Sequence, residues 1–547
     1  MIVDPIISQQ RIDAMRAGGW WRDENLLDHF DAALLACPDA IAIVDYRTET
    51  GEKILMTYRQ LAEKAERVAV ALAHYGIEKQ DVVSFQLPNW WEFVVINLAC
   101  LRIGAVSNPL MPIFREHELS FMVAFAESKV LIIPKEFRGF DHQQMIAGMR
   151  DKLPQLEHVF VVGGDAENSF EAALLNHNLT TDSAALFKAR QLDPNDVVLM
   201  LYTSGTTGMP KGVMHCANTF LFSVDKMIER CELTQEDDIF MGSPLAHLTG
   251  FMYGMWMPMV LKTKMIFLDV WDVDLGWQLM AEEKASFAMG ATPFLADLSH
   301  SKQRENCNSE RFRLFVCGGA PIPSALAEKA TEALSIKLMA VWGMSECGVV
   351  TTTKLTDPPE KIFGSDGVAV PACEVKIVDE QGQVVAEGVE GRLFEKSPST
   401  FIGYLKRPEA YDVDENDFFD TGDLARKDVD GYIRITGRSK DIIIRGGENI
   451  PVVEVENILY KHPDIVDCAV VAMPDERLGE LGCCFVTLSE GVSFSFQNMI
   501  DYLLENQLAK NYLPEHLEII NDMPRTASGK IQKFQLREMA KNFSRHS

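Results

Sequence analysis

The chain has no pair of cysteines spaced as C-x-x-C, and its eleven cysteines are an odd number. A disulfide framework is therefore disfavoured. The adjacent Cys483 and Cys484 lie in an apolar run that is typical of a strand. We expect reduced, buried thiols, as in proteins of a reducing compartment.

The chain has fewer basic than acidic residues: 52 Lys and Arg and 79 Asp and Glu give a net charge of −27. A field of that sign repels DNA and anionic lipid, so nucleic acid is excluded as an expected partner. The same field does not exclude a small polyanion such as ATP. A local nest of N–H groups with one lysine outweighs distant, screened surface charge.

Long apolar runs without charges are also missing. The longest apolar stretches, 94–114 and 251–270, are interrupted by charged residues, and residues 1–10 lack a basic region and a cleavage site. These features predict neither secretion nor a transmembrane segment, and they favour a cytoplasmic protein. The sequence leaves homo-oligomer formation open.

The length of 547 residues is roughly 3.6 times the ~150 residues of an ordinary domain, which predicts at least two domains. From about Tyr58, amphipathic helical stretches alternate with short apolar runs. This alternation predicts layered α/β structure with a mostly parallel sheet. The predicted strands include Val82–Leu87, Lys129–Pro134, His158–Val162, Val197–Tyr202, Arg313–Cys317 and Lys337–Trp342.

After Gly364 the pattern changes to β-branched alternation, with turn signals at Gln381-Gly382 and Asp430-Gly431 that predict antiparallel hairpins. The charged segment 437–441 separates this stretch from a compact α+β unit, which contains one clear amphipathic helix around 496–504. We therefore expect a large N-terminal domain, residues 1–437, whose part at about 364–437 is a β-barrel-like subdomain. A small C-terminal domain, residues 438–547, follows it.

A loop rich in glycine and hydroxyl groups follows the predicted strand 197–202. It reads Thr203-Ser204-Gly205-Thr206-Thr207-Gly208-Met209-Pro210-Lys211-Gly212. Its glycines permit close backbone approach, its hydroxyls donate to phosphate oxygens, and its lysine adds a mobile charge. This composition favours a triphosphate. It is not a Walker A loop, which would need Gly at 210 and Ser or Thr at 212.

Six further short motifs follow this loop along the chain. They are Gly318-Gly319-Ala320-Pro321; Trp342-Gly343-Met344-Ser345-Glu346; Phe419-Asp420-Thr421-Gly422-Asp423; Gly437-Arg438-Ser439-Lys440-Asp441; Arg445-Gly446-Gly447-Glu448-Asn449; and Pro524-Arg525-Thr526-Ala527-Ser528-Gly529-Lys530. With the phosphate loop, they make the chain resemble the adenylate-forming superfamily of acyl-CoA synthetases, adenylation domains and beetle luciferases. It looks most like short- and medium-chain fatty acid–CoA ligases and cyclohexanecarboxylate–CoA ligase.

The resemblance implies an ATP-dependent acyl-CoA ligase that uses Mg²⁺ and coenzyme A. A carboxylate attacks the α-phosphorus of ATP, pyrophosphate leaves, and CoA then displaces AMP from the acyl adenylate. The residues implied to bind the nucleotide are Thr203, Ser204, Gly205, Thr206, Thr207, Gly208, Lys211, Gly319, Ala320, Pro321, Trp342, Gly343, Met344, Ser345, Asp423 and Arg438. Thr206, His247, Glu346 and Lys530 are the implied catalytic residues.

Individual roles follow from the same resemblance. Glu346 would hold Mg²⁺ through a hard carboxylate oxygen, and the Trp342 ring would stack on adenine. Asp423 would accept the ribose hydroxyls, with Arg438 beside it. Lys530 would bridge the substrate carboxylate and the α-phosphate, where the transition state gathers negative charge.

The second half-reaction needs a thiol in the place of that lysine, so the C-terminal domain must rotate. Lys440 matches the family's hinge, where a large change of φ and ψ occurs. Gly446 and Gly447 would line the pantetheine tunnel, and no residue is assigned to the 3′-phosphate of CoA.

The acid pocket is expected between the phosphate loop and Gly318. Its predicted residues are His247, Phe251, Ala291 and Thr292. The Met- and aromatic-rich segment around Phe251 fits an apolar acyl chain and equally fits a core helix. Segments 244–257 and 290–293 contain no Lys or Arg, which favours an uncharged acid over a dicarboxylate.

Three other functions stay open from the sequence. The chain could load acyl groups onto a separate carrier protein, act as a luciferase-like oxygenase, or serve as a non-catalytic nucleotide or acyl sensor. The sensor is disfavoured because Lys530, Glu346 and Asp423 are all present.

Overall fold

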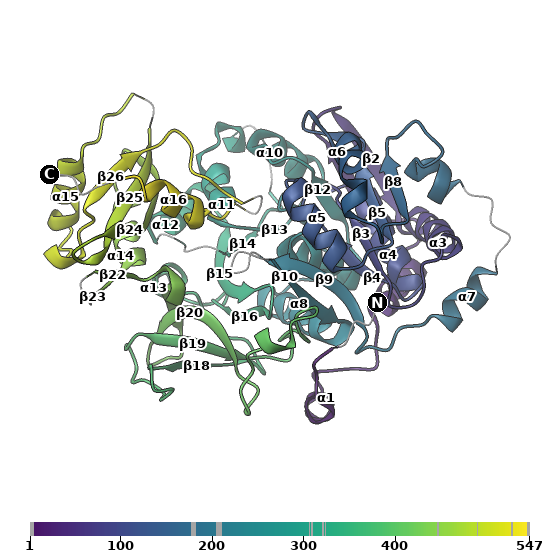
Figure 1. Cartoon of the computed structure of the whole chain (residues 1–547), viewed down its shortest axis with the longest axis horizontal. Helices are drawn as coiled ribbons and strands as arrows, with labels where there is room; N and C mark the ends of the chain where they lie inside the picture. Colours follow the sequence, from purple (N-terminus) through teal and green to yellow (C-terminus); the bar gives the residue numbers. More distant parts are fainter. Residues whose placement is uncertain are drawn as a thin grey trace.

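The computed structural model of the chain describes residues 5–176, 182–203, 210–305, 307, 310–319, 322, 324–445, 448–489, 491–526 and 529–543. Two large α/β sheets form the body, a four-stranded antiparallel sheet adjoins them, and a five-stranded sheet belongs to the C-terminal lobe (Figure 1). The predicted fold class, a large α/β domain followed by a small α+β domain, is confirmed. Two helices, α1 (Gln9–Ala17) and α2 (Leu26–Ala36), precede the first strand.

A six-stranded sheet carries the phosphate loop. Its order is β10-β9-β4-β3-β5-β8, with β10 antiparallel to β9 and the other pairs parallel. The strands are β3 (Val82–Phe85), β4 (Val106–Pro109), β5 (Val130–Pro134), β8 (His158–Val162), β9 (Val197–Thr203) and β10 (Lys211–Cys216). The four strands predicted in this region are confirmed to within two residues. Apolar runs identify such strands because both faces of the sheet are covered. The helices of this region are α3 (Tyr58–His74), α4 (Trp91–Arg102), α5 (Glu116–Phe125), α6 (His142–Met149) and α7 (Ser183–Ala189).

A nine-stranded sheet forms the rest of the body, in the order β17-β16-β15-β14-β13-β11-β12-β1-β2. Its six central strands are parallel, and the antiparallel strands lie at the two edges. The strands are β1 (Ile41–Arg47), β2 (Glu52–Thr57), β11 (Ile239–Met241), β12 (Met265–Leu268), β13 (Phe287–Gly290), β14 (Leu314–Gly318), β15 (Lys337–Met344), β16 (Gly348–Thr352) and β17 (Val368–Ala369). Gly319 and Glu346 follow the carboxyl ends of β14 and β15, where open α/β sheets place their ligands.

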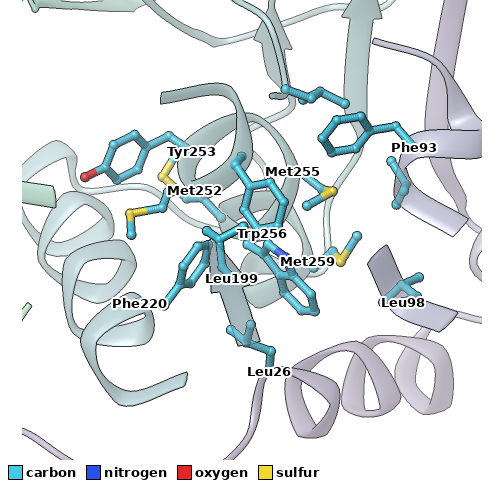
Figure 2. Packing of buried hydrophobic residues seen from close by; sticks show 14 of the residues in the cluster. Leu26, Phe93, Leu98, Leu199, Phe220, Met252, Tyr253, Met255, Trp256 and Met259 are labelled. Atoms are coloured by element: carbon cyan, nitrogen blue, oxygen red, sulfur yellow. The ribbon is translucent and has the colours of Figure 1, made fainter. Parts of the chain in front are cut away.

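Helices from both halves of the body cover these sheets. They are α8 (Ala217–Cys231), α9 (Met257–Leu261), α10 (Val273–Glu282), α11 (Thr292–His300), α12 (Ser324–Leu334) and α13 (Pro359–Gly364). The π-helical segment η3 (Gly250–Trp256) leads directly into α9. Figure 2 shows Met252, Met255 and Trp256 of η3 among Phe93 and Phe220. The Trp256 indole donates to Asn97 Oδ1 at 3.1 Å. Most of the Met-rich segment is therefore core.

The β-rich stretch is a four-stranded antiparallel sheet of β18 (Glu374–Val378), β19 (Gly391–Lys396), β20 (Phe419–Lys427) and β21 (Ile433–Arg438), in that order. The hairpin predicted at Asp430-Gly431 is confirmed between β20 and β21. The one predicted at Gln381-Gly382 is confirmed as a short hairpin, in which an antiparallel bridge joins Val378 to Val384 and the Val385 N–H donates to the Ile377 carbonyl at 3.0 Å, while β19 also pairs with β18. The Asp379 side chain accepts from the N–H groups of Gln381 and Gln383, which closes a local turn.

The C-terminal lobe contains a five-stranded sheet with three helices (Figure 1). Its elements are β22 (Ile443–Arg445), β23 (Glu448–Ile450), α14 (Val452–Leu459), β24 (Ile465–Asp475), β25 (Gly479–Leu488), α15 (Phe496–Glu505), β26 (His516–Ile519) and α16 (Lys533–Ala540). The predicted amphipathic helix is confirmed as α15, which buries Met499 and Leu503. The predicted domain boundary falls at the end of β21, where the short turn Ser439–Asp441 begins.

All eleven cysteines are free and nine of them are buried, as expected of reduced thiols. Within the described ranges, every helix is too short or too polar to cross a bilayer.

Candidate active site

A cavity of about 2040 Å³ lies where the ends of β9, β14 and β15 meet the β20–β21 hairpin and the C-terminal lobe. Most of the described residues that the sequence predicts for the site line it. They are Thr203, Lys211, His247, Thr292, Gly319, Trp342, Gly343, Met344, Ser345, Glu346, Asp423, Arg438 and Lys530. Motifs spread from residue 203 to residue 530 thus face one space.

Other predicted residues have a different placement. Ser204, Gly205, Thr206, Thr207, Gly208, Ala320, Pro321, Gly446 and Gly447 lie outside the described residues, and only the backbone of Lys440 is described. Phe251 is fully buried and packs edge-to-face against Phe93 and Phe220. Ala291 lies in a core cluster beneath α11. Neither of these two lines the cavity.

Glu346 follows β15 and is buried in the cavity wall. Its Oε1 accepts a hydrogen bond from the Tyr404 hydroxyl at 2.8 Å, and its carbonyl accepts from the N–H of Phe401 at 2.6 Å. Burial raises the pKa of Glu346 above its usual value, an effect that the Tyr404 hydroxyl opposes. No Lys, Arg or His among the described residues forms an ion pair with it.

Asp423 lies on β20, opposite Arg438 of β21 in the antiparallel ladder. Its Oδ1 lies 2.9 Å from Nε of Arg438, and its Oδ2 accepts from the Trp342 indole at 2.9 Å. The carboxylate is therefore held by donors from two sheets, in an orientation that exposes it to the cavity. The hydrogen bond also fixes the Trp342 ring, so the predicted adenine and ribose contacts are mechanically linked.

Lys530 reaches the cavity from the C-terminal lobe. Two hydrogen bonds to Thr526 hold its backbone: the Lys530 N–H donates to Thr526 Oγ1 at 3.0 Å, and the Thr526 N–H donates to the Lys530 carbonyl at 2.7 Å. The lysine side chain lies against Gly319, where an added Cβ would be 3.2 Å from its Cε. Burial, and next to it the charge of Arg438, lowers the pKa of Lys530 to about 8.

His247 lines the cavity near Lys530. Burial, with a smaller contribution from the charge of Lys530, lowers the pKa of His247 to about 3. The imidazole is therefore neutral at physiological pH, and it is too weakly basic to act as a general base near pH 7. It can still shape the pocket and form hydrogen bonds, and its Nδ1 accepts from the Thr249 N–H at 3.4 Å.

Tyr404 is the contact residue that the sequence reasoning missed. Besides holding Glu346, its ring lies under Lys211, whose Nζ is 4.6 Å from the ring centre. His215 Nε2 similarly bonds the Ser345 carbonyl at 2.7 Å. Because both partners are more than fifty positions away in the chain, no local pattern in the sequence signals either contact.

The residues present fit a magnesium ion bound with its nucleotide. A cluster of three or more His, Cys, Asp or Glu side chains is absent from the described part of the chain, which excludes an all-protein cage there. Mg²⁺ usually keeps waters and takes one or two carboxylates plus substrate phosphates. Glu346 is buried in the cavity wall and makes no ion pair with a described residue, so it offers such a carboxylate.

Comparisons with known proteins agree with this geometry. The family described as AMP-binding enzyme matches residues 30–405, and the AMP-binding enzyme C-terminal domain matches residues 454–530. The chain belongs to the AMP-binding enzyme family. Within this family it is 38% identical over 541 residues to the medium-chain fatty-acid–CoA ligase of Escherichia coli (strain K12), covering 98% of this chain and 94% of that protein. It is accordingly an enzyme of the ATP-dependent acyl-CoA ligase class.

Solved structures of the family align with this chain over most of its length. ATP-bound MatB from Rhodopseudomonas palustris aligns with a TM-score of 0.81 at 28% identity, over 95% of this chain and 99% of MatB. The apo structure of MatB aligns with a TM-score of 0.70 at 27% identity, over 95% and 99%. This AMP-binding enzyme thus superimposes better on the ATP-bound form than on the apo form.

Proposed function

We propose that this enzyme activates an uncharged monocarboxylic acid of short or medium chain length, or an alicyclic one, as its CoA thioester. The observation that carries this proposal is the meeting of Lys530 with Gly319, in the cavity that Glu346 and Asp423 also line. A C-terminal lysine placed over the nucleotide residues of the body fits the formation of an acyl adenylate.

In the first step the acid's carboxylate attacks the α-phosphorus of ATP, and pyrophosphate leaves. Lys211 and the phosphate loop bind the triphosphate, while Asp423 and Arg438 bind the ribose and Trp342 flanks the adenine. Lys530 supplies positive charge to the oxygens on which the transition state gathers negative charge. Glu346 would help to hold Mg²⁺ with the bound nucleotide, and the ion would supply positive charge against the triphosphate.

In the second step the CoA thiol attacks the acyl carbonyl and AMP leaves. Because Lys530 lies against Gly319 in the cavity and is proposed to act in the first step, we propose that the C-terminal lobe, residues 438–547, then rotates about Lys440. Gly446 and Gly447 would then line the path of the pantetheine arm. The better superposition on an ATP-bound relative supports the view that the lobe stands here in the position for the first step.

The nature of the acid is inferred from the cavity wall near His247. Ala246, Leu248, Tyr253, Met289 and Val349 line this part with apolar surface. No Lys or Arg occurs in 244–257 or 290–293 to pair with a second carboxylate. The similarity to a medium-chain fatty-acid–CoA ligase points the same way.

Release of AMP and pyrophosphate should be measured against acids from C3 to C12, alicyclic acids and aromatic acids, with and without CoA. We expect AMP and thioester from uncharged aliphatic or alicyclic acids only when CoA is present. AMP formation that ignores CoA would favour a carrier-protein acceptor. Splitting of ATP to ADP, or no turnover of any acid with Mg²⁺, would contradict the proposal.

A further inference from the structure

The N-terminal segment, residues 6–21 and here called the strap, contacts the loop 397–404 of the body, and its Trp20 also packs edge-on against Phe222 of α8. Helix α1 lies outside the layered sheets, at the lower edge of Figure 1. Before it, the Ile6 N–H donates to the Ile402 carbonyl at 2.6 Å, and after it, the Trp21 indole donates to the Pro398 carbonyl at 2.9 Å. The segment therefore spans the loop from one end to the other.

Arg11 of α1 makes the central contact of this strap. Its side chain is buried, and its Nη2 donates to the Thr400 carbonyl at 2.5 Å, while Nη1 donates to the Phe401 carbonyl at 3.3 Å. The same Nη1 donates to the Tyr411 hydroxyl at 2.7 Å. Within the described ranges Arg11 makes no ion pair, and its guanidinium hydrogen bonds go to the loop and to Tyr411.

The loop in turn holds Glu346. The Phe401 N–H donates to the Glu346 carbonyl at 2.6 Å, and the Tyr404 hydroxyl donates to Glu346 Oε1 at 2.8 Å. Ser399 Oγ donates to the carbonyl of Cys347, the next residue, at 2.6 Å. Both the main chain and the carboxylate of Glu346 thus depend on where residues 399–404 lie. Arg11 bonds the carbonyl of Phe401, whose own N–H bonds Glu346.

We propose that Arg11 is a positioning residue for Glu346, which it acts on through the loop 397–404, and that the N-terminal strap thereby sets how tightly the nucleotide site takes up Mg²⁺. The inference rests on the proposed role of Glu346. Removing a residue that orients a metal-binding carboxylate typically weakens metal affinity about 10- to 100-fold. Arg11 contacts the loop 397–404 rather than Glu346 itself, so we expect its removal to weaken magnesium affinity less, by about three- to tenfold.

The test compares Arg11→Met with Arg16→Met. Arg16 lies on the same helix and, among the described residues, forms its ion pair with exposed Asp23, so it controls for a lost positive charge on α1. The magnesium midpoint is measured twice: for ATP binding by calorimetry without acid or CoA, and for acid-dependent pyrophosphate exchange. We expect Arg11→Met to raise both midpoints about three- to tenfold, with exchange largely restored at saturating Mg²⁺. Arg16→Met should leave both within twofold of wild type.

A double-mutant cycle with Tyr404→Phe tests the path. If Arg11 acts through the loop, the shifts of the two single variants should not multiply in the double variant, because both act on one carboxylate. A merely structural Arg11 would lower the melting temperature and leave the magnesium midpoints unmoved, which would overturn the inference, as would independent effects in the cycle. Should Arg11→Met fail to fold, Trp21→Phe, which removes the indole N–H that bonds the Pro398 carbonyl, carries the same expectation.

The two proposals fail separately. If the wild type catalyses acid-dependent pyrophosphate exchange but Arg11→Met has the wild-type magnesium midpoint, the inference is refuted and the ligase function stands. A shifted midpoint of ATP binding, with no exchange for any acid, keeps the inference and refutes the proposed reaction.

Discussion

Replacement of Lys530 by alanine should separate the two half-reactions. The side chain lies against Gly319, with Nζ 3.7 Å from where a Cβ at that position would be. Since its pKa is lowered only to about 8, roughly 90% of the ammonium stays protonated at pH 7. Removing one preorganised donor from a developing negative charge slows a reaction by about 10²- to 10³-fold, or roughly 2.7–4 kcal/mol. We expect that loss in adenylation.

The assay follows each step by itself. Acid-dependent pyrophosphate exchange reports adenylation, and conversion of a synthetic acyl adenylate by CoA reports thioester formation. The second rate should change by less than about threefold, because the proposed rotation takes Lys530 out of the site before that step. Lys533→Met is the matched control, since Lys533 lies three positions later and pairs with Glu456 at 2.7 Å. Adenylation by Lys530→Ala at the wild-type rate would refute the assignment of Lys530, and an equal loss in both steps would refute its restriction to the first.

Three further outcomes follow from the same geometry. Because the lowered pKa of Lys530 means that its charge is present below about pH 8 and lost above it, kcat/KM for adenylation should fall as pH rises through 8; a flat profile up to pH 9.5 for wild type would count against this. Lys440→Pro should spare pyrophosphate exchange and block thioester formation, because proline fixes φ at the proposed hinge; equal loss of both steps would argue against a hinge there. Gly343→Ala should destabilise the enzyme by about 1–3 kcal/mol, seen as a lower thermal midpoint, because its Cβ would lie 1.9 Å from the Gly348 carbonyl oxygen; Gly437→Ala, with nothing within 4 Å, should leave that midpoint unchanged.

The secondary structure of the body could be predicted because its signals are local. Buried parallel strands are short apolar runs, and β3, β5, β8 and β9 were each marked by such a run. The turn signal at Gln381-Gly382 likewise marked the bridge between Val378 and Val384, but it gave no sign of the longer pairing of β18 with β19. Strand partners depend on contacts across the chain that a turn signal does not contain.

Residues of the candidate site could be located by motif, whereas the contacts that hold them could not. Glu346 and Asp423 were identified from their own segments, but Tyr404 and Trp342, which orient them, lie 58 and 81 positions away. Gly343 illustrates the limit in another way. It was assigned to the nucleotide, and in the structure the tight approach of β15 to Gly348 is itself enough to require glycine there.

The acid pocket was the least predictable part, for a physical reason. Methionine and aromatic side chains fill a core and line an acyl pocket equally well, so composition does not separate the two. In the structure, the residues of this segment divide between core and cavity wall. Phe251 and Trp256 pack in the core among Phe93 and Phe220, while His247 and Tyr253 line the cavity. The Tyr253 hydroxyl bonds Ser223 Oγ at 2.8 Å, and Ser223 Oγ accepts from the Val349 N–H at 2.9 Å. Three distant segments therefore form this part of the wall, so the length of acid that fits depends on tertiary contacts rather than on any one stretch of sequence.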